Sequence, residues 1–89
     1  MHAVVVRVTV TNQDGSAEDR LRNEVVPQVS GAPGFQAGYW TRDGDSGLAM
    51  IVFDSEDNAK AAAERVPSTV PQEDVNLEGV EVREVVASA

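Results

Sequence analysis

The sequence contains no cysteine among its 89 residues. This absence excludes disulfide bridges, thiolate zinc sites, iron–sulfur clusters and a cysteine nucleophile. Basic residues are also scarce, because 7 lysines and arginines stand against 15 acidic residues and give a formal net charge of −8. An acidic chain with scattered basic residues repels nucleic-acid phosphates and anionic membrane surfaces. We therefore expect neither a nucleic acid nor a membrane as a partner.

Long apolar runs are missing as well. No uninterrupted apolar stretch of the sequence approaches the ~20 residues that a membrane-spanning helix needs. The first residues, Met1 to Arg7, lack the pattern of a secretion signal and predict a strand instead. A hydrophobic fraction of 42% and a charged fraction of 25% are typical of a soluble globular chain. We expect one domain over residues 1–89, in a reducing cytoplasm that suits a small fold without disulfides.

The first part of the sequence predicts a strand followed by a helix. Residues 2–11 are β-branched nearly throughout, and valine occupies four successive even positions ending at Val10, so that one face of the strand is apolar. Ser16 and Asp19 resemble a capping box and start a helix. Apolar residues recur along this helix every four positions, at Ala17, Leu21, Val25 and Val29. Pro27 should kink this helix or end it early, because proline lacks an amide donor and crowds the preceding turn.

A hairpin of two strands is predicted next. Residues 35–42 have the aromatic and β-branched density of a strand, and residues 48–53 form a second, shorter strand. The five residues between them are rich in glycine and aspartate and predict the hairpin loop, Asp43-Gly44-Asp45-Ser46-Gly47. The loop is too short for an EF-hand calcium site and lacks its closing glutamate, which favours a simple turn.

The remaining residues predict a second helix and a last strand. Ser55 offers a capping hydroxyl, and the two acidic residues after it suit the positive end of a helix. The helix carries a narrow stripe of small apolar side chains and ends around Pro67; the stripe consists of Ala59, Ala62, Ala63 and Val66. Residues 75–86 predict the last strand, with alternation in the part from Val80 to Val85 and Gly79 as a candidate bulge.

These elements follow the order βαββαβ and predict an α+β fold with a four-stranded antiparallel sheet. Because strand–helix–strand crossovers are right-handed, both helices should cover one face of the sheet. The other face stays bare, although the strands carry apolar residues on both sides, as in Ala3 and Val5 against Val4 and Val6. A bare apolar face needs cover, and a small domain gains stability by association. We therefore predict that the chain pairs with itself as a homodimer through the open sheet face.

Two segments give the chain a family resemblance. Ala32-Pro33-Gly34-Phe35 leads into the second strand, and Phe53-Asp54-Ser55-Glu56-Asp57 leads from the third strand into the second helix. With the element order, they make essentially the whole chain resemble the dimeric α/β-barrel superfamily, whose fold is ferredoxin-like, and especially its antibiotic-biosynthesis monooxygenase-like branch. The resemblance implies a dimeric α/β barrel. It also implies activities of that superfamily, which include oxygenation of polycyclic aromatic compounds without metal or flavin, and haem degradation.

Two departures from this branch leave the catalytic residues unknown. Active members often carry a tryptophan near the end of the third strand and a histidine in the second helix, where this chain has Phe53 and Ala61-Ala62-Ala63. The single histidine, His2, lies at the outer end of the first strand and should be solvated. Haem ligation therefore lacks a histidine in the required place, and we expect neither a metal nor another cofactor.

Candidate ligand-binding residues lie on the first three strands. Trp40 and Arg42 share one side of their strand, and a five-residue hairpin loop would put Met50 on that side as well. Such a cleft suits a planar, anionic aromatic molecule, whereas the alternative places Trp40 in the core or in a dimer interface. Tyr39, on the opposite side, either donates a hydrogen bond to a ligand or packs in the sheet. Arg7 either anchors a ligand carboxylate or, as we favour, pairs with a glutamate of the last strand: Glu78, Glu81 or Glu84.

Two functions remain open. The first is a non-catalytic dimeric module that binds a metabolite or a protein partner, and it predicts a filled core. The second is a cofactor-independent monooxygenase-like enzyme acting on a small aromatic molecule, and it predicts a ligand-sized cavity that reaches the candidate residues, Trp40, Tyr39, Arg42 or Met50. The missing tryptophan and histidine of the active branch members favour the first function.

Overall fold

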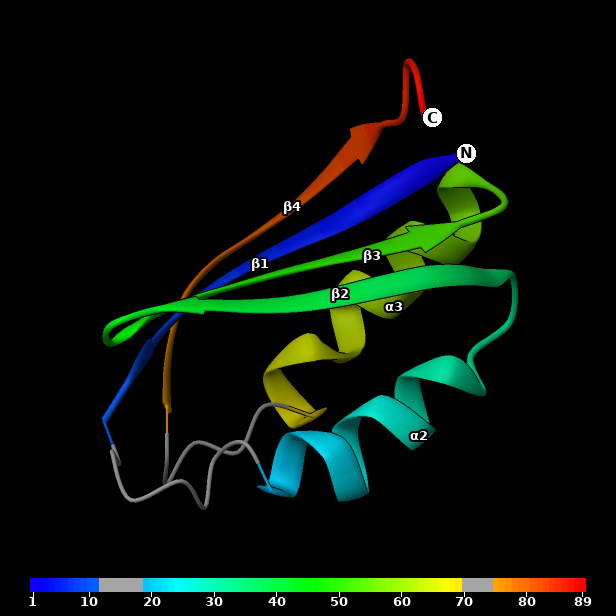
Figure 1. Ribbon diagram of the computed structural model, residues 1–89. Helices are drawn as coiled ribbons and strands as arrows, with labels where there is room; N and C mark the ends of the chain where they lie inside the picture. Colours follow the sequence, from blue (N-terminus) through cyan, green and yellow to red (C-terminus); the bar gives the residue numbers. More distant parts are fainter. Residues whose placement is uncertain (12–18, 70–74) are drawn as a thin grey trace.

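The computed structural model describes residues 1–11, 19–69 and 75–89 of the chain. The strands in these ranges are β1 (His2–Val10), β2 (Phe35–Asp43), β3 (Ser46–Phe53) and β4 (Val75–Glu84). The first helix joins a π-helical turn, η1 (Leu21–Val25), to α2 (Val26–Ser30), and the second helix is α3 (Glu56–Thr69). The predicted order βαββαβ is confirmed (Figure 1). Ser16 and Ala17, where the first helix is expected to begin, lie outside the described residues.

The strands form one antiparallel sheet in the order β2-β3-β1-β4. This strand order, with two helices, is that of a ferredoxin-like α+β fold, so the predicted fold class is confirmed. Both helices lie on the same side of the sheet, as right-handed crossovers require (Figure 1). We call the side without helices the open face.

The hairpin between β2 and β3 is tighter than the sequence predicts. Asp43 pairs with Ser46, which leaves a loop of only Gly44 and Asp45. Gly44 has a φ of 62°, the positive value that a two-residue hairpin loop needs. The prediction of a five-residue loop is therefore wrong. Because side chains alternate along a strand, the shorter loop changes which residues of β2 and β3 share a face of the sheet.

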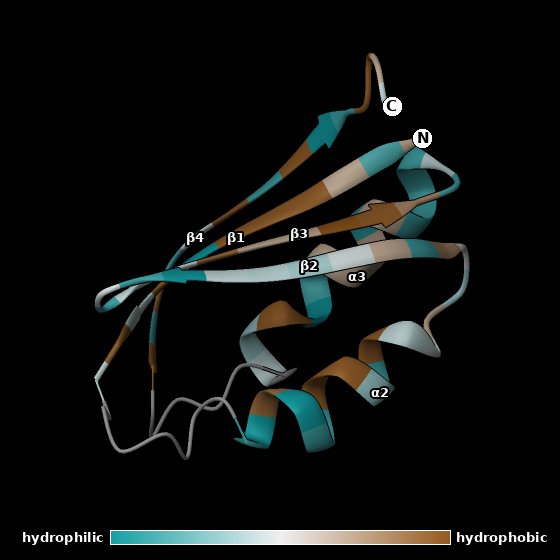
Figure 2. Ribbon diagram, in the orientation of Figure 1, coloured by the Kyte–Doolittle hydropathy of each residue, from teal (hydrophilic) through white to brown (hydrophobic). Residues whose placement is uncertain are grey.

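The core lies between the helices and the sheet. Val4 on β1, Phe53 on β3 and Ala59 on α3 are fully buried there. The hydrophobic colouring in Figure 2 is concentrated on β1, on β3 and along the helices. The small side chain of Ala59 lets α3 lie close against the strands, as its stripe of alanines predicts.

The first helix continues past Pro27 instead of ending there. In the π-helical turn η1, the amide of Val26 donates to the carbonyl of Leu21. A proline at position 27 has no amide hydrogen, and its ring crowds the carbonyl of Asn23 one turn earlier. A widened turn relieves this crowding, and α2 then runs on to Ser30. The distortion expected at Pro27 is thus a π-helical turn.

The two segments that carry the family resemblance meet at one corner of the fold. The amide of Asp54 donates to the carbonyl of Gly34 at 2.9 Å, and the Asn58 side chain donates to the Asp54 carboxylate at 2.8 Å. Gly34 has a φ of 79°, and a Cβ at this position would overlap the side chains of Asp54 and Asn58. Phe35 and Phe53 pack edge to face with ring centroids 6.3 Å apart. These residues therefore tie the end of the first helix to the start of the second.

Candidate functional site

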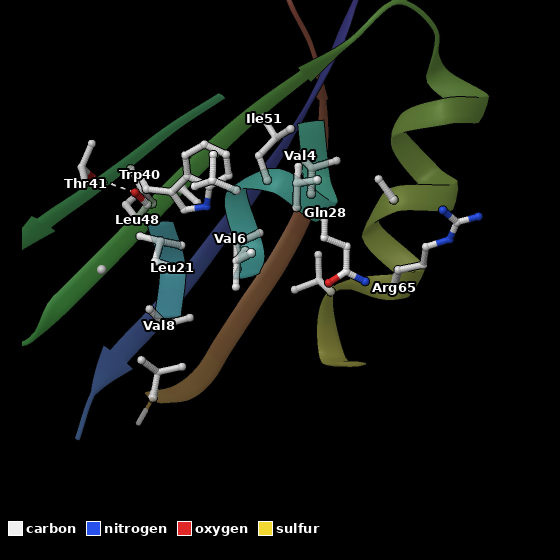
Figure 3. Close-up of a pocket in the computed structure, with 18 of the residues that line it drawn as sticks. Val4, Val6, Val8, Leu21, Gln28, Trp40, Thr41, Leu48, Ile51 and Arg65 are labelled. Carbon is white, nitrogen blue, oxygen red and sulfur yellow. Dashed lines mark hydrogen bonds between the residues drawn. The ribbon is translucent and has the colours of Figure 1, made fainter. Parts of the chain in front are cut away.

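A cavity of about 520 Å³ lies between the sheet and the two helices. Its floor is the helix-facing side of β1 and β3, and its walls come from η1, α2 and α3. The floor is apolar and includes Val4, Val6, Val8 and Ile51, whose side chains Figure 3 shows between the strands and the helices. The filled core expected of a non-catalytic module is therefore not what the structure has.

The cavity exists because the first helix stands off the sheet. No residue of η1 or α2 is buried. Nevertheless the apolar stripe of this helix faces the cavity, through Leu21, Val25, Val26 and Val29. By contrast, α3 buries Ala59 and Val66 in the core. An apolar stripe that faces a sheet without closing on it leaves space that a ligand can fill.

Trp40 reaches the cavity from β2. The indole is half-buried, and its cross-strand partner on β3, Ala49, belongs to the core. Gly38 makes room for the ring, because a Cβ at this position would lie 2.8 Å from Cη2 and 2.9 Å from Cζ3 of Trp40. Figure 3 shows the ring beside Ile51, with Val6 and Val8 of β1 lower in the view. An indole next to branched aliphatic side chains offers a surface suited to a flat apolar molecule.

The charged residues in the described lining of the cavity are arginines. Arg22 on η1, Arg42 on β2 and Arg65 on α3 line it, and all three side chains are exposed at its edge. The polar, uncharged lining residues are Gln28 and Thr41. Among the described residues that line the cavity, none carries a carboxylate, an imidazole, a thiol or a phenol. The site therefore offers hydrogen-bond donors and positive charge around an apolar interior.

The polar lining residues differ in how firmly they are held. The Nε of Arg42 donates to the Gly44 carbonyl at 2.7 Å, which ties this guanidinium to the hairpin. The hydroxyl of Thr41 donates to the Leu48 carbonyl at 2.8 Å. Arg22 and Arg65 form no ion pair with any residue in the described ranges. Their guanidinium groups are therefore available to a ligand.

The structure separates the candidate residues of β2 and β3 into two groups. Trp40 and Arg42 face the helices and line the cavity together. Met50 pairs with Tyr39 on the open face, where their exposed fractions are 43% and 65%. The expectation that Met50 shares a side with Trp40 is wrong, because it depends on the five-residue loop. Tyr39 and Met50 are accordingly residues of the open face, away from the cavity.

Arg7 also lies on the open face, where its Nη1 is 2.9 Å from Oε1 of Glu81. The ion pair favoured from the sequence is confirmed. Arg83 binds the other carboxylate oxygen of Glu81 at 2.7 Å. The hydrogen bond from Arg7, followed by that from Arg83, holds the pKa of Glu81 below its usual value. The two arginines and the glutamate form one charged network beside the apolar part of the open face.

His2 is expected from the sequence to be solvated, but in the structure most of its side chain is covered, and it lies beside the start of the second helix. Its side chain is 21% exposed, and its Nε2 lies 3.2 Å from Oε2 of Glu56 at the start of α3. Its Nδ1 is buried and has no hydrogen-bond partner among the described residues. Lys60 binds the second oxygen of Glu56 at 2.9 Å, and its hydrogen bond and charge, with a smaller effect of His2, lower the pKa of Glu56. His2 therefore fastens the first strand to the second helix.

The sequence analysis identifies the apolar helical residues of the cavity but misses its two helical arginines, Arg22 and Arg65. Arg22 adjoins Leu21 and Arg65 adjoins Val66, so each arginine flanks an apolar position that faces the sheet. The signal that could have identified Arg22 and Arg65 is their position at the margin of an apolar helical stripe, because a long arginine side chain there can reach the edge of a core.

A scan of the chain against protein-family models and a search of curated proteins both find no match. The described residues include no group of histidine, aspartate and glutamate side chains that could hold a metal ion. In the same ranges, no helix is long and apolar enough to cross a membrane. The fold and the cavity are therefore the observations from which a function can be argued.

Proposed function

We propose that this chain binds a small apolar molecule in the cavity between the sheet and the two helices. The cavity itself carries the proposal, since it has about 520 Å³ of mostly apolar space and is reached by Trp40. Ligand pockets in proteins typically measure ~300–1,000 Å³ and combine an apolar lining with a few polar groups. A core that keeps such a space forgoes packing energy, which a bound ligand restores.

The second candidate function is a cofactor-independent monooxygenase-like enzyme acting on a small aromatic molecule. The family resemblance implies this function, and a cavity that reaches Trp40 and Arg42 is the feature that it predicts. The described lining has no group that exchanges a proton near neutral pH, and this composition supports binding over acid–base catalysis. We therefore place the metabolite-binding function first.

The test uses Trp40, the only tryptophan of the sequence. Titration with naphthalene, anthracene and alkyl compounds should change its fluorescence in a saturable manner, because a molecule in the cavity contacts the indole. If no compound gives a saturable change, the cavity is not a binding site. Consumption of dioxygen on addition of a compound that binds would instead support the enzyme.

We also propose that the chain forms a homodimer through the open face. Tyr39 and Met50 lie opposite each other there and are among the large hydrophobic side chains that stay exposed. The next cross-strand pair on this face, Ala37 and Val52, extends the apolar area along β2 and β3. Both helices cover the other face, so a second sheet is the element that fits against this one. Face-to-face pairing of two such sheets would give the dimeric α/β barrel that the family resemblance implies.

A further inference from the structure

We propose that the cavity takes an amphipathic anion, an apolar molecule that carries a carboxylate, and that Arg22 and Arg65 bind its charged end. The inference rests on the proposed function, because it names the class of molecule that the cavity binds. It follows from the placement of arginines from two helices around one apolar space.

The first argument is the distribution of charge. The sequence has 15 acidic and 7 basic residues, yet the described lining of the cavity has arginines from three elements and no acidic residue. The charge of the described lining is thus opposite in sign to the net charge of −8. A cleft lined by charges of one sign attracts a ligand of the other sign, and the acidic remainder of the surface leaves this cleft as the favourable place for an anion.

The second argument is that two of these arginines form no ion pair with the described residues, so a ligand would displace no such pair. Arg42 is held by the hairpin carbonyl of Gly44. On the open face, Arg7 and Arg83 share the carboxylate of Glu81. Arg22 and Arg65 form no ion pair within the described ranges, so neither guanidinium has an acidic partner there that an incoming carboxylate would have to displace. Guanidinium binds carboxylate through paired hydrogen bonds of matching geometry.

The third argument is the position of the polar groups relative to the apolar floor. Figure 3 shows Trp40 on the β2 side of the cavity and Arg65 on α3 across from it, with Gln28 extending from α2 toward α3. An apolar body can therefore rest on the valines of β1 beside the indole while its carboxylate reaches the edge. Arg22 and Arg65 are exposed, so the ion pair forms where little desolvation of the carboxylate is required.

The experiment compares matched carboxylates and alcohols. Naphthoate, anthracene carboxylate and decanoate, with the corresponding alcohols, are titrated against the full chain while Trp40 fluorescence is followed. We expect at least one carboxylate to bind about tenfold more tightly than its alcohol, because a charged hydrogen bond contributes about this factor. Added salt should lower the affinity for the carboxylate and leave the affinity for the alcohol unchanged, because ions screen the interaction of exposed charges.

Variants identify the residues. R22Q/R65Q should abolish the preference for the carboxylate and keep the affinity for the alcohol. The control K60Q/R83Q makes the same change of net charge away from the cavity and should keep the preference. Equal binding of each carboxylate and its alcohol to the unmodified chain overturns this inference and leaves the proposed function standing. Loss of the preference in K60Q/R83Q also overturns it, and saturable binding of neither series overturns the inference together with the proposed function.

Discussion

Gly38 and Trp40 depend on each other, because the indole occupies the space that a side chain at position 38 would need. A Cβ would lie 2.8 Å from the ring, so G38A must displace the indole. We expect G38A to lower the free energy of unfolding by about 1–3 kcal/mol, the usual cost of overpacking, and to shift the Trp40 emission. Urea denaturation followed by circular dichroism measures the first effect and fluorescence the second.

The matched control for G38A is G79A, on β4. A Cβ at Gly79 would have no neighbour within 4 Å. Alanine there should leave the Trp40 emission unchanged and change the stability by less than about 1 kcal/mol. If both variants behave alike, the fit between Gly38 and the indole does not govern the position of the ring.

Glu81 makes the stability of the sheet depend on pH. The arginines around it keep its pKa in the folded chain below the ordinary value of 4.5, so folding favours the ionised form. Its contribution is complete above the unfolded pKa and is lost as the pH falls through the lower, folded pKa. We therefore expect the stability difference between the unmodified chain and E81Q to be largest near neutral pH and to shrink below about pH 4.5.

Urea denaturation of both proteins from neutral to acidic pH measures this difference, which should also shrink in added salt because both arginine partners are exposed. E64Q, on the exposed side of α3, controls for the removal of a carboxylate. A difference between the unmodified chain and E81Q that stays constant across the pH range would show that the ion pairs do not stabilise the folded chain.

Part of the site follows from residue patterns and part does not. Trp40 and Arg42 belong together because residues two apart on a strand share a face. Arg22 and Arg65 are different, because an arginine beside an apolar helical position fits a solvated surface as well as the edge of a cavity. The sequence also predicts that Arg7 forms an ion pair with a glutamate of the last strand, but it does not distinguish among three candidates. The strand register shows that the partner is Glu81.

At the scale of the elements, a substitution on α3 can fill the cavity without changing any charged residue. Ala62 lines the cavity, whereas Ala61 is exposed on the same helix. We expect A62L to raise the free energy of unfolding by about 1–2 kcal/mol through added apolar burial and to abolish probe binding. A61L should alter stability by less than about 0.5 kcal/mol and keep probe binding.

Thermal denaturation and Trp40 fluorescence measure the effects of A62L and A61L. Undiminished probe binding by A62L would place the binding site elsewhere than between α3 and the sheet.

The order of elements could be predicted, but two distances between elements could not. The hairpin loop is the first, because a run rich in glycine and aspartate shows that the chain turns without showing where pairing stops. Because the loop has two residues and not five, Met50 and Trp40 lie on opposite faces of the sheet instead of sharing one. The second is the gap under the first helix, because apolar periodicity identifies the face toward the sheet and leaves the depth of packing open. The apolar pattern of the first helix therefore does not determine whether a cavity lies beneath it.

At the scale of the whole molecule, the sheet separates two proposed functions. The cavity with Trp40 is on the helix side, and Tyr39 with Met50 is on the open face. A ligand on one side and a second copy of the chain on the other contact different side chains of the same strands. Each proposal can therefore be tested by a variant that leaves the other side of the sheet unchanged.

M50E tests the open face. Met50 is 43% exposed and lies between Tyr39 on β2 and Val5 on β1, so a glutamate there would place a charge at the centre of the apolar area. In a face-to-face dimer this charge would be buried without a partner, and we expect the dissociation constant to rise at least ~100-fold. Sedimentation equilibrium at micromolar concentration should find the unmodified chain dimeric and M50E monomeric. A61E, on the exposed side of α3, should stay dimeric, and M50E should still bind the cavity probes. A monomeric unmodified chain at that concentration would mean that the open face has another occupant or none.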